Sequence, residues 1–264
     1  MTSTLVAPPT SPVDALERLL VTVRERPSGS YRAVGFLTYN NADGYSFAYL
    51  RRELERDSFR PLPGLARAVE SPASSSSLFP VFAERVISAR RPDREVSLAA
   101  LGLSPGAAPF EVLVRSHGQR VGDTIELLPA PYAAPGEAVS FTFLTHGVRH
   151  LPAENQARIT DLVRGEPLLL RVDPENRVDP RARLVTDRGD ADLGWLPSPL
   201  LDVVDRVGEY RLSVERANGP EVGFHFRLLV RFNGRLSLIG PPLFEVPHWA
   251  IGQESAGDAS CGLR

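Results

Sequence analysis

The sequence predicts a β-rich α+β fold that is divided into two domains. The chain has 264 residues, more than the roughly 100–200 residues of a typical single domain. Short runs of alternating apolar and polar residues, bounded by turn sequences, recur in both halves and are typical of strands. Between the halves, residues 129–135 read Pro-Ala-Pro-Tyr-Ala-Ala-Pro, which is typical of a stiff linker. We therefore predict an N-terminal tail and helix over residues 1–28, domains over 29–130 and 136–250, and a disordered tail over 251–264.

In the first half we expect a helix and then a hairpin. Ser11 and Pro12 suit the N-cap and first turn of a helix over residues 11–23, which has apolar residues at helical spacing. Residues 31–39 and 45–50 alternate like paired strands, and Asp43-Gly44 between them is a hairpin signal. Further along, the patterns predict short helices over 78–87 and 98–103 and strands over 110–114 and 121–128.

The second half alternates short strands with two short helices. Strands are predicted over residues 139–145, 167–172, 182–185, 193–196, 209–216 and 223–232. Helices are predicted over 153–163 and 199–206. Close spacing of short strands with turn signals indicates a small β-barrel that carries helices.

Composition limits the classes of function. The formal net charge of −2 and the pI of about 6.2 exclude a polycation that coats nucleic acid, so any DNA contact needs a local patch. All basic residues apart from histidine are arginines, which excludes mechanisms that need a lysine. A single cysteine, the absence of a signal-peptide pattern and the absence of a long apolar run predict a cytoplasmic protein with no membrane contact.

The sequence gives little support to an enzyme or to a bound cofactor. The histidines at positions 117, 146, 150, 225 and 248 show no metal-ligand spacing. Cys261 lies in a polar tail, which is a poor place for an activated nucleophile. We therefore expect a binding protein with no catalytic residues, no metal and no cofactor.

Four short motifs in the second half, taken in order, resemble those of the HIRAN domain. They are His-Gly-Val-Arg-His over residues 146–150, Arg-Gly-Glu-Pro over 164–167, Asp-Pro-Glu-Asn-Arg-Val-Asp over 173–179 and Leu-Gly-Trp-Leu-Pro over 193–197. The resemblance implies a HIRAN-like barrel. It also implies DNA binding, because HIRAN domains of helicase-like remodelling proteins hold the 3′ end of single-stranded DNA between two tyrosines, an arginine and an acid.

Carried onto this sequence, the resemblance assigns the arginine to Arg149, the first ring to His150, the turn amide to Asn176 and the acid to Asp179. Val178 stands where the second tyrosine is expected and cannot stack on a base. Looser DNA contact through several arginines is the alternative: Arg149, Arg171, Arg177 and Arg183. Trp195 completes the candidate set as a stacking platform.

Each candidate also has a purely structural explanation. Asn176 and Asp179 nucleate turns through their own backbone without any ligand. Trp195 is explained by core packing, and His150 by an ordinary surface position. These alternatives stay open at this stage.

The first half has a weaker resemblance, carried by residues 45–49, 59–65, 78–82 and 98–103, to the N-terminal subdomain of HipA-type toxin kinases. Tyr45, Phe47 and Tyr49 share one strand face, either as core or as a protein-binding edge. The combined prediction is a non-enzymatic bacterial accessory protein in DNA repair or toxin–antitoxin systems, whose second half binds single-stranded DNA or DNA ends and whose first half contacts a protein partner. The alternative prediction is an antitoxin-like regulator that binds a HipA-type kinase.

Overall fold

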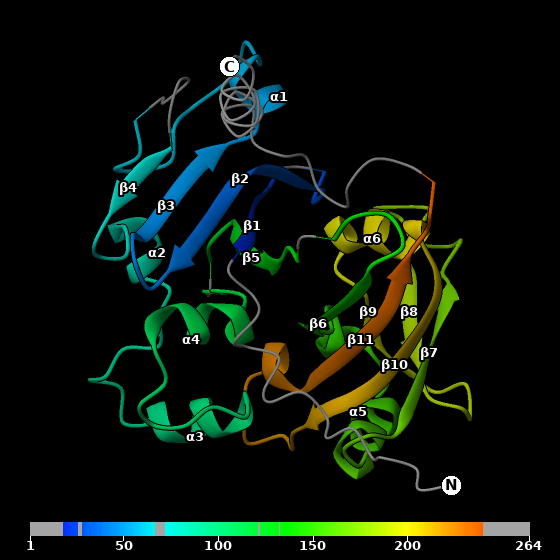
Figure 1. Ribbon diagram of the computed structural model, residues 1–264. Coiled ribbons are helices and arrows are strands. Elements are labelled where there is room, and N and C mark those ends of the chain that lie inside the picture. The colour runs from blue at the N-terminus through cyan, green and yellow to red at the C-terminus, as the bar shows by residue number, and fades with distance from the viewer. Residues whose placement is uncertain (1–17, 26–27, 67–71, 121, 132, 240–264) are drawn as a thin grey trace, which may run out of the picture.

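The structure, a computed structural model, is an α+β fold dominated by two antiparallel sheets with short helices around them (Figure 1). It describes residues 18–25, 28–66, 72–120, 122–131 and 133–239. The predicted fold class is confirmed. The predicted C-terminal tail and Cys261 lie outside the described residues. Within the described ranges, no helix has both the length and the apolar character needed to cross a membrane.

The first sheet has the strand order β4-β3-β2-β1-β5. Its strands are β1 (Arg18–Arg24), β2 (Tyr31–Asn40), β3 (Gly44–Tyr49), β4 (Ala73–Ser75) and β5 (Ile125–Pro129). The predicted hairpin is β2–β3, in which Leu37 faces Phe47. Its turn forms because the Asn40 side chain accepts hydrogen bonds from the backbone of Ala42 and Asp43, and Gly44 takes a φ of +79°.

The predicted helix over residues 11–23 is wrong for the part that the structure describes. Residues 18–24 form β1, which pairs with β2 on one side and with β5 on the other. A central strand is covered on both faces, so Leu19, Leu20 and Val21 are all buried. Such an uninterrupted apolar run fits a buried helix as well as a buried strand.

Four short helices accompany the first sheet: α1 (Arg51–Leu54), α2 (Pro80–Ala83), α3 (Arg94–Ala100) and α4 (Pro109–Ser116). The predicted strand over residues 110–114 is wrong, since these residues belong to α4. Pro109 begins the helix, as proline often does. Phe110, Leu113 and Val114 pack into the core of the first sheet, while Val112 packs into a second cluster on another side.

The second sheet has the order β6-β11-β10-β7-β8-β9. Its strands are β6 (Ala138–Leu144), β7 (Pro167–Val172), β8 (Arg183–Thr186), β9 (Asp192–Trp195), β10 (Val207–Ala217) and β11 (Leu228–Leu236). The helical segments are α5 (Ala153–Asp161), α6 (Leu201–Arg206) and the 3-10 turns η1 (Val148–His150), η2 (Ser198–Leu200) and η3 (Phe224–Phe226). The predicted barrel with helices matches this half.

The second sheet curls until its two edges meet (Figure 1). β7 pairs with β10 at Pro167 and Leu168 and with β8 from Leu169 onward, so the sheet bends at this strand. The edges join at an isolated antiparallel bridge between His146, just after β6, and Trp195 in β9. This bridge closes the small barrel at the position of two predicted site motifs.

The two halves share buried surface. One cluster joins Leu98, Leu101 and Val112 of the first half to Leu144 and Leu229 of the second. Ala130 and Ala133, in the segment that was predicted as a linker, are also buried. The seam between the halves is therefore a place where side chains of both can build one site.

Candidate nucleic-acid site

A cavity of about 840 Å³ lies at the seam between the halves. Five of the six predicted site residues line it: Arg149, His150, Asn176, Asp179 and Trp195. The sixth, Arg177, is exposed in the same turn as Asn176 but does not line the cavity. The volume is in the range of pockets that bind small organic ligands, and it suits a nucleotide.

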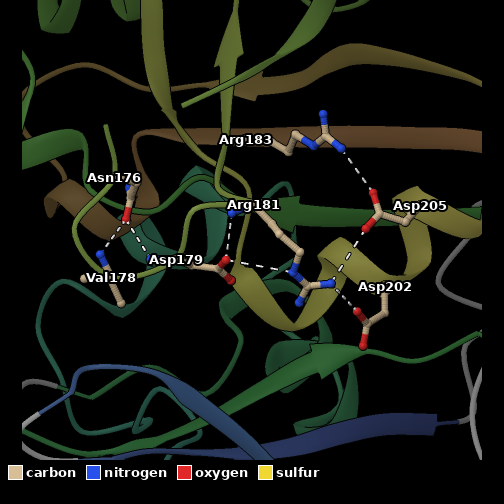
Figure 2. Close-up of polar contacts among 7 residues, drawn as sticks. All are labelled: Asn176, Val178, Asp179, Arg181, Arg183, Asp202 and Asp205. Carbon is tan, nitrogen blue, oxygen red and sulfur yellow. Dashed lines mark hydrogen bonds and ion pairs between the residues drawn. The ribbon is translucent and has the colours of Figure 1, made fainter. Parts of the chain in front are cut away.

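The turn over residues 173–179 is built by Asn176 (Figure 2). Its Oδ1 accepts the backbone N–H groups of Val178 and Asp179 at 3.0 and 3.1 Å, and its Nδ2 donates to Asp173. Asp179 Oδ1 accepts the backbone N–H of Arg181 at 2.8 Å. The turn-forming explanation therefore holds for Asn176, which acts by holding its neighbours at the cavity wall.

Several arginines near this turn are paired with aspartates. Figure 2 shows Arg181 between Asp202 and Asp205 of α6, with Arg183 on the other side of Asp205. Arg171 pairs with Asp190 and Asp192 in the same way. Arg171 and Arg183, two arginines of the loose surface considered as an alternative, thus have acidic partners and do not line the cavity.

Arg149 differs from those arginines. It is exposed on η1, and no carboxylate within the described ranges forms an ion pair with it. Its Nε donates to Nε2 of His150 at 2.9 Å, which aligns the two side chains on the cavity rim. An unpaired guanidinium beside a flat ring is a suitable contact for a phosphate next to a base.

Trp195 is held in place from three sides. Its indole Nε1 donates to Asp173 Oδ2 at 2.8 Å, and its backbone is bridged to His146. Gly147 lies against its ring with a φ of +72°, and an added Cβ there would come within 2.5 Å of the ring. Trp195 packs against the barrel core, as the structural explanation expected, and it also lines the cavity. Its role as a stacking platform stays a prediction.

Below the rim lies a buried carboxylate that the sequence did not single out. Glu126 Oε1 accepts hydrogen bonds from His146 Nε2 at 2.7 Å and from Gln119 Nε2 at 2.9 Å. His117 Nδ1 lies 3.4 Å away. Burial acts to raise the pKa of Glu126, but His146 and His117 outweigh it and hold this pKa well below its ordinary range. Glu126 is therefore negatively charged at neutral pH, and its hydrogen bond to His146 joins β5 to the barrel.

Two of the histidines that looked scattered in the sequence thus meet at one acid. They are separated from it by 9 and 20 positions, a spacing that matches no motif. In the described ranges, no group of three or more His, Cys, Asp or Glu side chains is arranged to hold a metal ion.

The sequence also missed two aromatic residues of the cavity. Phe224 of η3 lines the cavity with 49% of its surface exposed, and Val178, which stands where a ring was expected, lines it as well. Tyr31 of β2 also lines the cavity, and its ring centroid is 5.7 Å from that of His146. Burial and the charge of Glu126 raise the pKa of Tyr31, so its hydroxyl stays protonated.

The first half contributes to the cavity but not through its predicted edge. Tyr45, Phe47 and Tyr49 are all buried in the core of the first sheet, as the core interpretation expected. A protein-binding edge made of these three rings is therefore wrong. The residues of this half that reach the cavity are instead Arg24, Tyr31 and the segment around Arg120.

Among known proteins, no family model matches the chain and no curated protein matches it. A crystal structure of a protein from Lactobacillus plantarum is similar over 38% of this chain and 97% of that one, with 21% identity and a TM-score of 0.31. The crystal structure of the HIRAN domain of human HLTF is similar over 39% of this chain and 81% of that one, with 18% identity and a TM-score of 0.27. The HipA-like nature of the first half stays a prediction, and the function proposed next rests on the site itself.

Proposed function

We propose that the chain is a non-enzymatic accessory protein that binds single-stranded DNA, and DNA ends in particular, in the cavity between its halves. The observation that carries this proposal is the exposed Arg149, without an acidic partner in the described ranges, on the rim of a cavity that Trp195 and Phe224 also line. Arginine binds phosphate, and aromatic side chains stack on unpaired bases. In this proposal a partner protein supplies any catalysis.

Each side chain has a defined role in the proposal. Arg149 and His150 contact the phosphate and sugar next to the bound nucleotide. Phe224 supplies the stacking surface that Val178 cannot give, and Trp195 forms the rigid floor. Asn176 positions the turn that carries Asp179, whose second carboxylate oxygen accepts a hydrogen bond from the strand end.

The test is fluorescence anisotropy with labelled single-stranded oligonucleotides whose 3′ ends are free or blocked by phosphate, with a duplex for comparison. We expect the free single strand to bind most tightly, because a duplex has no unstacked base and a terminal phosphate would face Asp179. Binding should weaken at higher salt, since phosphate contacts release counterions.

The matched variants are Arg149→Ala and Arg52→Ala. Both arginines are exposed and neither has an acidic partner in the described ranges, but Arg52 on α1 is outside the cavity lining. Only Arg149→Ala should weaken binding. If the wild-type protein binds none of the oligonucleotides at micromolar concentration, the DNA proposal is refuted, and a pull-down for the alternative HipA-type kinase partner is the next measurement.

A further inference from the structure

Apart from histidine, the cavity lining has equal numbers of basic and acidic side chains. Three arginines line it, Arg24, Arg120 and Arg149, together with three acids, Asp123, Glu126 and Asp179. Whether the cavity attracts phosphate depends on which of these charges are already paired.

All three acids are held by groups of the protein. Asp123 contacts the buried guanidinium of Arg85, and its Oδ1 accepts backbone N–H groups at 2.6 and 3.1 Å. Glu126 is held by His146, Gln119 and His117. Asp179 accepts the backbone N–H of Arg181, whose guanidinium lies 3.9 Å away.

The cavity arginines are less engaged. Arg24, at the end of β1, donates from Nε to the carbonyl of Gly29 at 3.2 Å and has no acidic partner within the described residues. Arg120 pairs with Glu84 at 3.0 Å, but both side chains are more than half exposed, and such pairs contribute little. The guanidiniums of both arginines therefore keep capacity to bind phosphate oxygens.

These two arginines lie on the wall that belongs to the first half, while Arg149 lies on the wall of the barrel. Arg24 is the last residue of β1, the strand that pairs with β5, and Arg120 follows α4 in the loop that leads into β5. A strand whose end is held beside Trp195 and which leaves the cavity between these two walls would bring its next phosphates past the first-half arginines.

From this arrangement we infer that the first half is itself part of the nucleic-acid site, with Arg24 and Arg120 binding the phosphodiester backbone of single-stranded DNA that leads into the cavity. The inference rests on the proposed function, and it gives the first half a direct role in ligand binding beyond its predicted contact with a protein partner. It also explains how a chain of net charge −2 attracts DNA, since these arginines keep capacity for phosphate while the acids beside them are held by groups of the protein.

The experiment compares a dinucleotide with a dodecanucleotide of deoxythymidine, with the wild-type protein and the double variant Arg24→Ala/Arg120→Ala. Affinities are measured at several salt concentrations. The dinucleotide fills only the end of the cavity, so its affinity should be unchanged by the double variant. The dodecanucleotide should lose its extra affinity, and the slope of log K against log salt should fall by about 0.7 for each arginine removed.

Three controls make the outcome decisive. Arg52→Ala removes an exposed first-half arginine that does not line the cavity and should leave both affinities and the slope unchanged. Arg149→Ala should lower the affinity for both oligonucleotides. Thermal melting of each variant checks that the fold is intact.

Two results overturn the inference while leaving the proposed function in place. In one, the double variant binds the dodecanucleotide with the wild-type affinity and salt slope. In the other, it loses affinity equally for both lengths, which would place the arginines at the bound end and not along the strand. Failure of the wild-type protein to bind either ligand refutes the proposed function itself.

Discussion

Replacing Glu126 by glutamine tests whether the buried anion ties the two halves together. Glu126 Oε1 receives two hydrogen bonds, from His146 and Gln119, at 2.7 and 2.9 Å. Hydrogen bonds to a charged group contribute about 1.5–3 kcal/mol each. The amide oxygen of glutamine can keep one of them in weaker, neutral form. We therefore expect Glu126→Gln to lower the free energy of unfolding by about 2–3 kcal/mol at neutral pH.

The pH dependence of this loss has a definite sign. The pKa of Glu126 in the folded protein lies below that of an unfolded glutamate, which is about 4.3. A depressed pKa gives stability that is complete above the unfolded pKa and is lost as the pH falls toward the folded one. The difference between wild type and Glu126→Gln should therefore stay constant from neutral pH to about pH 5 and then shrink in more acidic solution.

Urea unfolding followed by tryptophan fluorescence at a series of pH values measures this difference. A melting-temperature shift of roughly 4–12 °C at neutral pH corresponds to the expected loss in a protein of this size. The matched control is Glu209→Gln on β10, an exposed carboxylate with no ion pair in the described ranges. The reasoning is refuted if Glu126→Gln is as stable as the control, or if the gap grows as the pH falls below 5.

Three further substitutions test the cavity. Gly147→Ala places a side chain at a φ of +72° and within 2.5 Å of the Trp195 ring, so it should cost about 1–3 kcal/mol in urea unfolding and abolish oligonucleotide binding; unchanged binding would show that the ring position is unimportant. Phe224→Ala should weaken binding by about 1–3 kcal/mol in anisotropy titrations, and the effect should vanish on an oligonucleotide with an abasic end; an equal loss on that ligand would contradict stacking. Asn176→Ala removes the acceptor of two backbone N–H groups and should cost about 1 kcal/mol of stability, whereas an unchanged unfolding curve would contradict its turn-forming role.

The elements that the sequence predicted well are those whose signal is local. The β2–β3 hairpin follows from alternation and from the turn around Asp43 and Gly44, and both are properties of adjacent residues. α6 and most strands of the barrel were found for the same reason. The last strand was predicted over residues 223–232, but it runs from Leu228 to Leu236, and Phe224–Phe226 form the 3-10 turn η3 before it. The cavity turn was also readable, because Asn176 forms it through its own neighbours.

The elements that the sequence misassigned are those buried on two sides. β1 lies between β2 and β5, and α4 packs into two apolar clusters, so each has consecutive buried apolar residues that obscure its period: Leu19, Leu20 and Val21 in β1, and Val112, Leu113 and Val114 in α4. For such segments the length of the apolar run and the residues at its two ends have to distinguish a strand from a helix. For α4 the signal of a helix was Pro109 at its first position.

The cavity residues of the first half could not be predicted from the sequence, because they join the site only when the two halves of the chain pack together. Arg24, Tyr31 and Glu126 come from three strands of the first sheet, and none belongs to a motif. What joins them to Arg149 is the packing of one half against the other. Linear spacing contains no information on that contact.

His146 is the residue at which these contacts converge. Its backbone pairs with Trp195 and closes the barrel, its side chain binds Glu126 of the first sheet, and the η1 turn with Arg149 begins two positions later. One short segment therefore closes the barrel, joins the halves and places Arg149 at the cavity. A ligand that contacts Arg149 and the first-half arginines together spans the same seam. Such a ligand binds the docked halves more tightly than the separated halves, and this difference in affinity is the free energy by which it stabilises the contact between them.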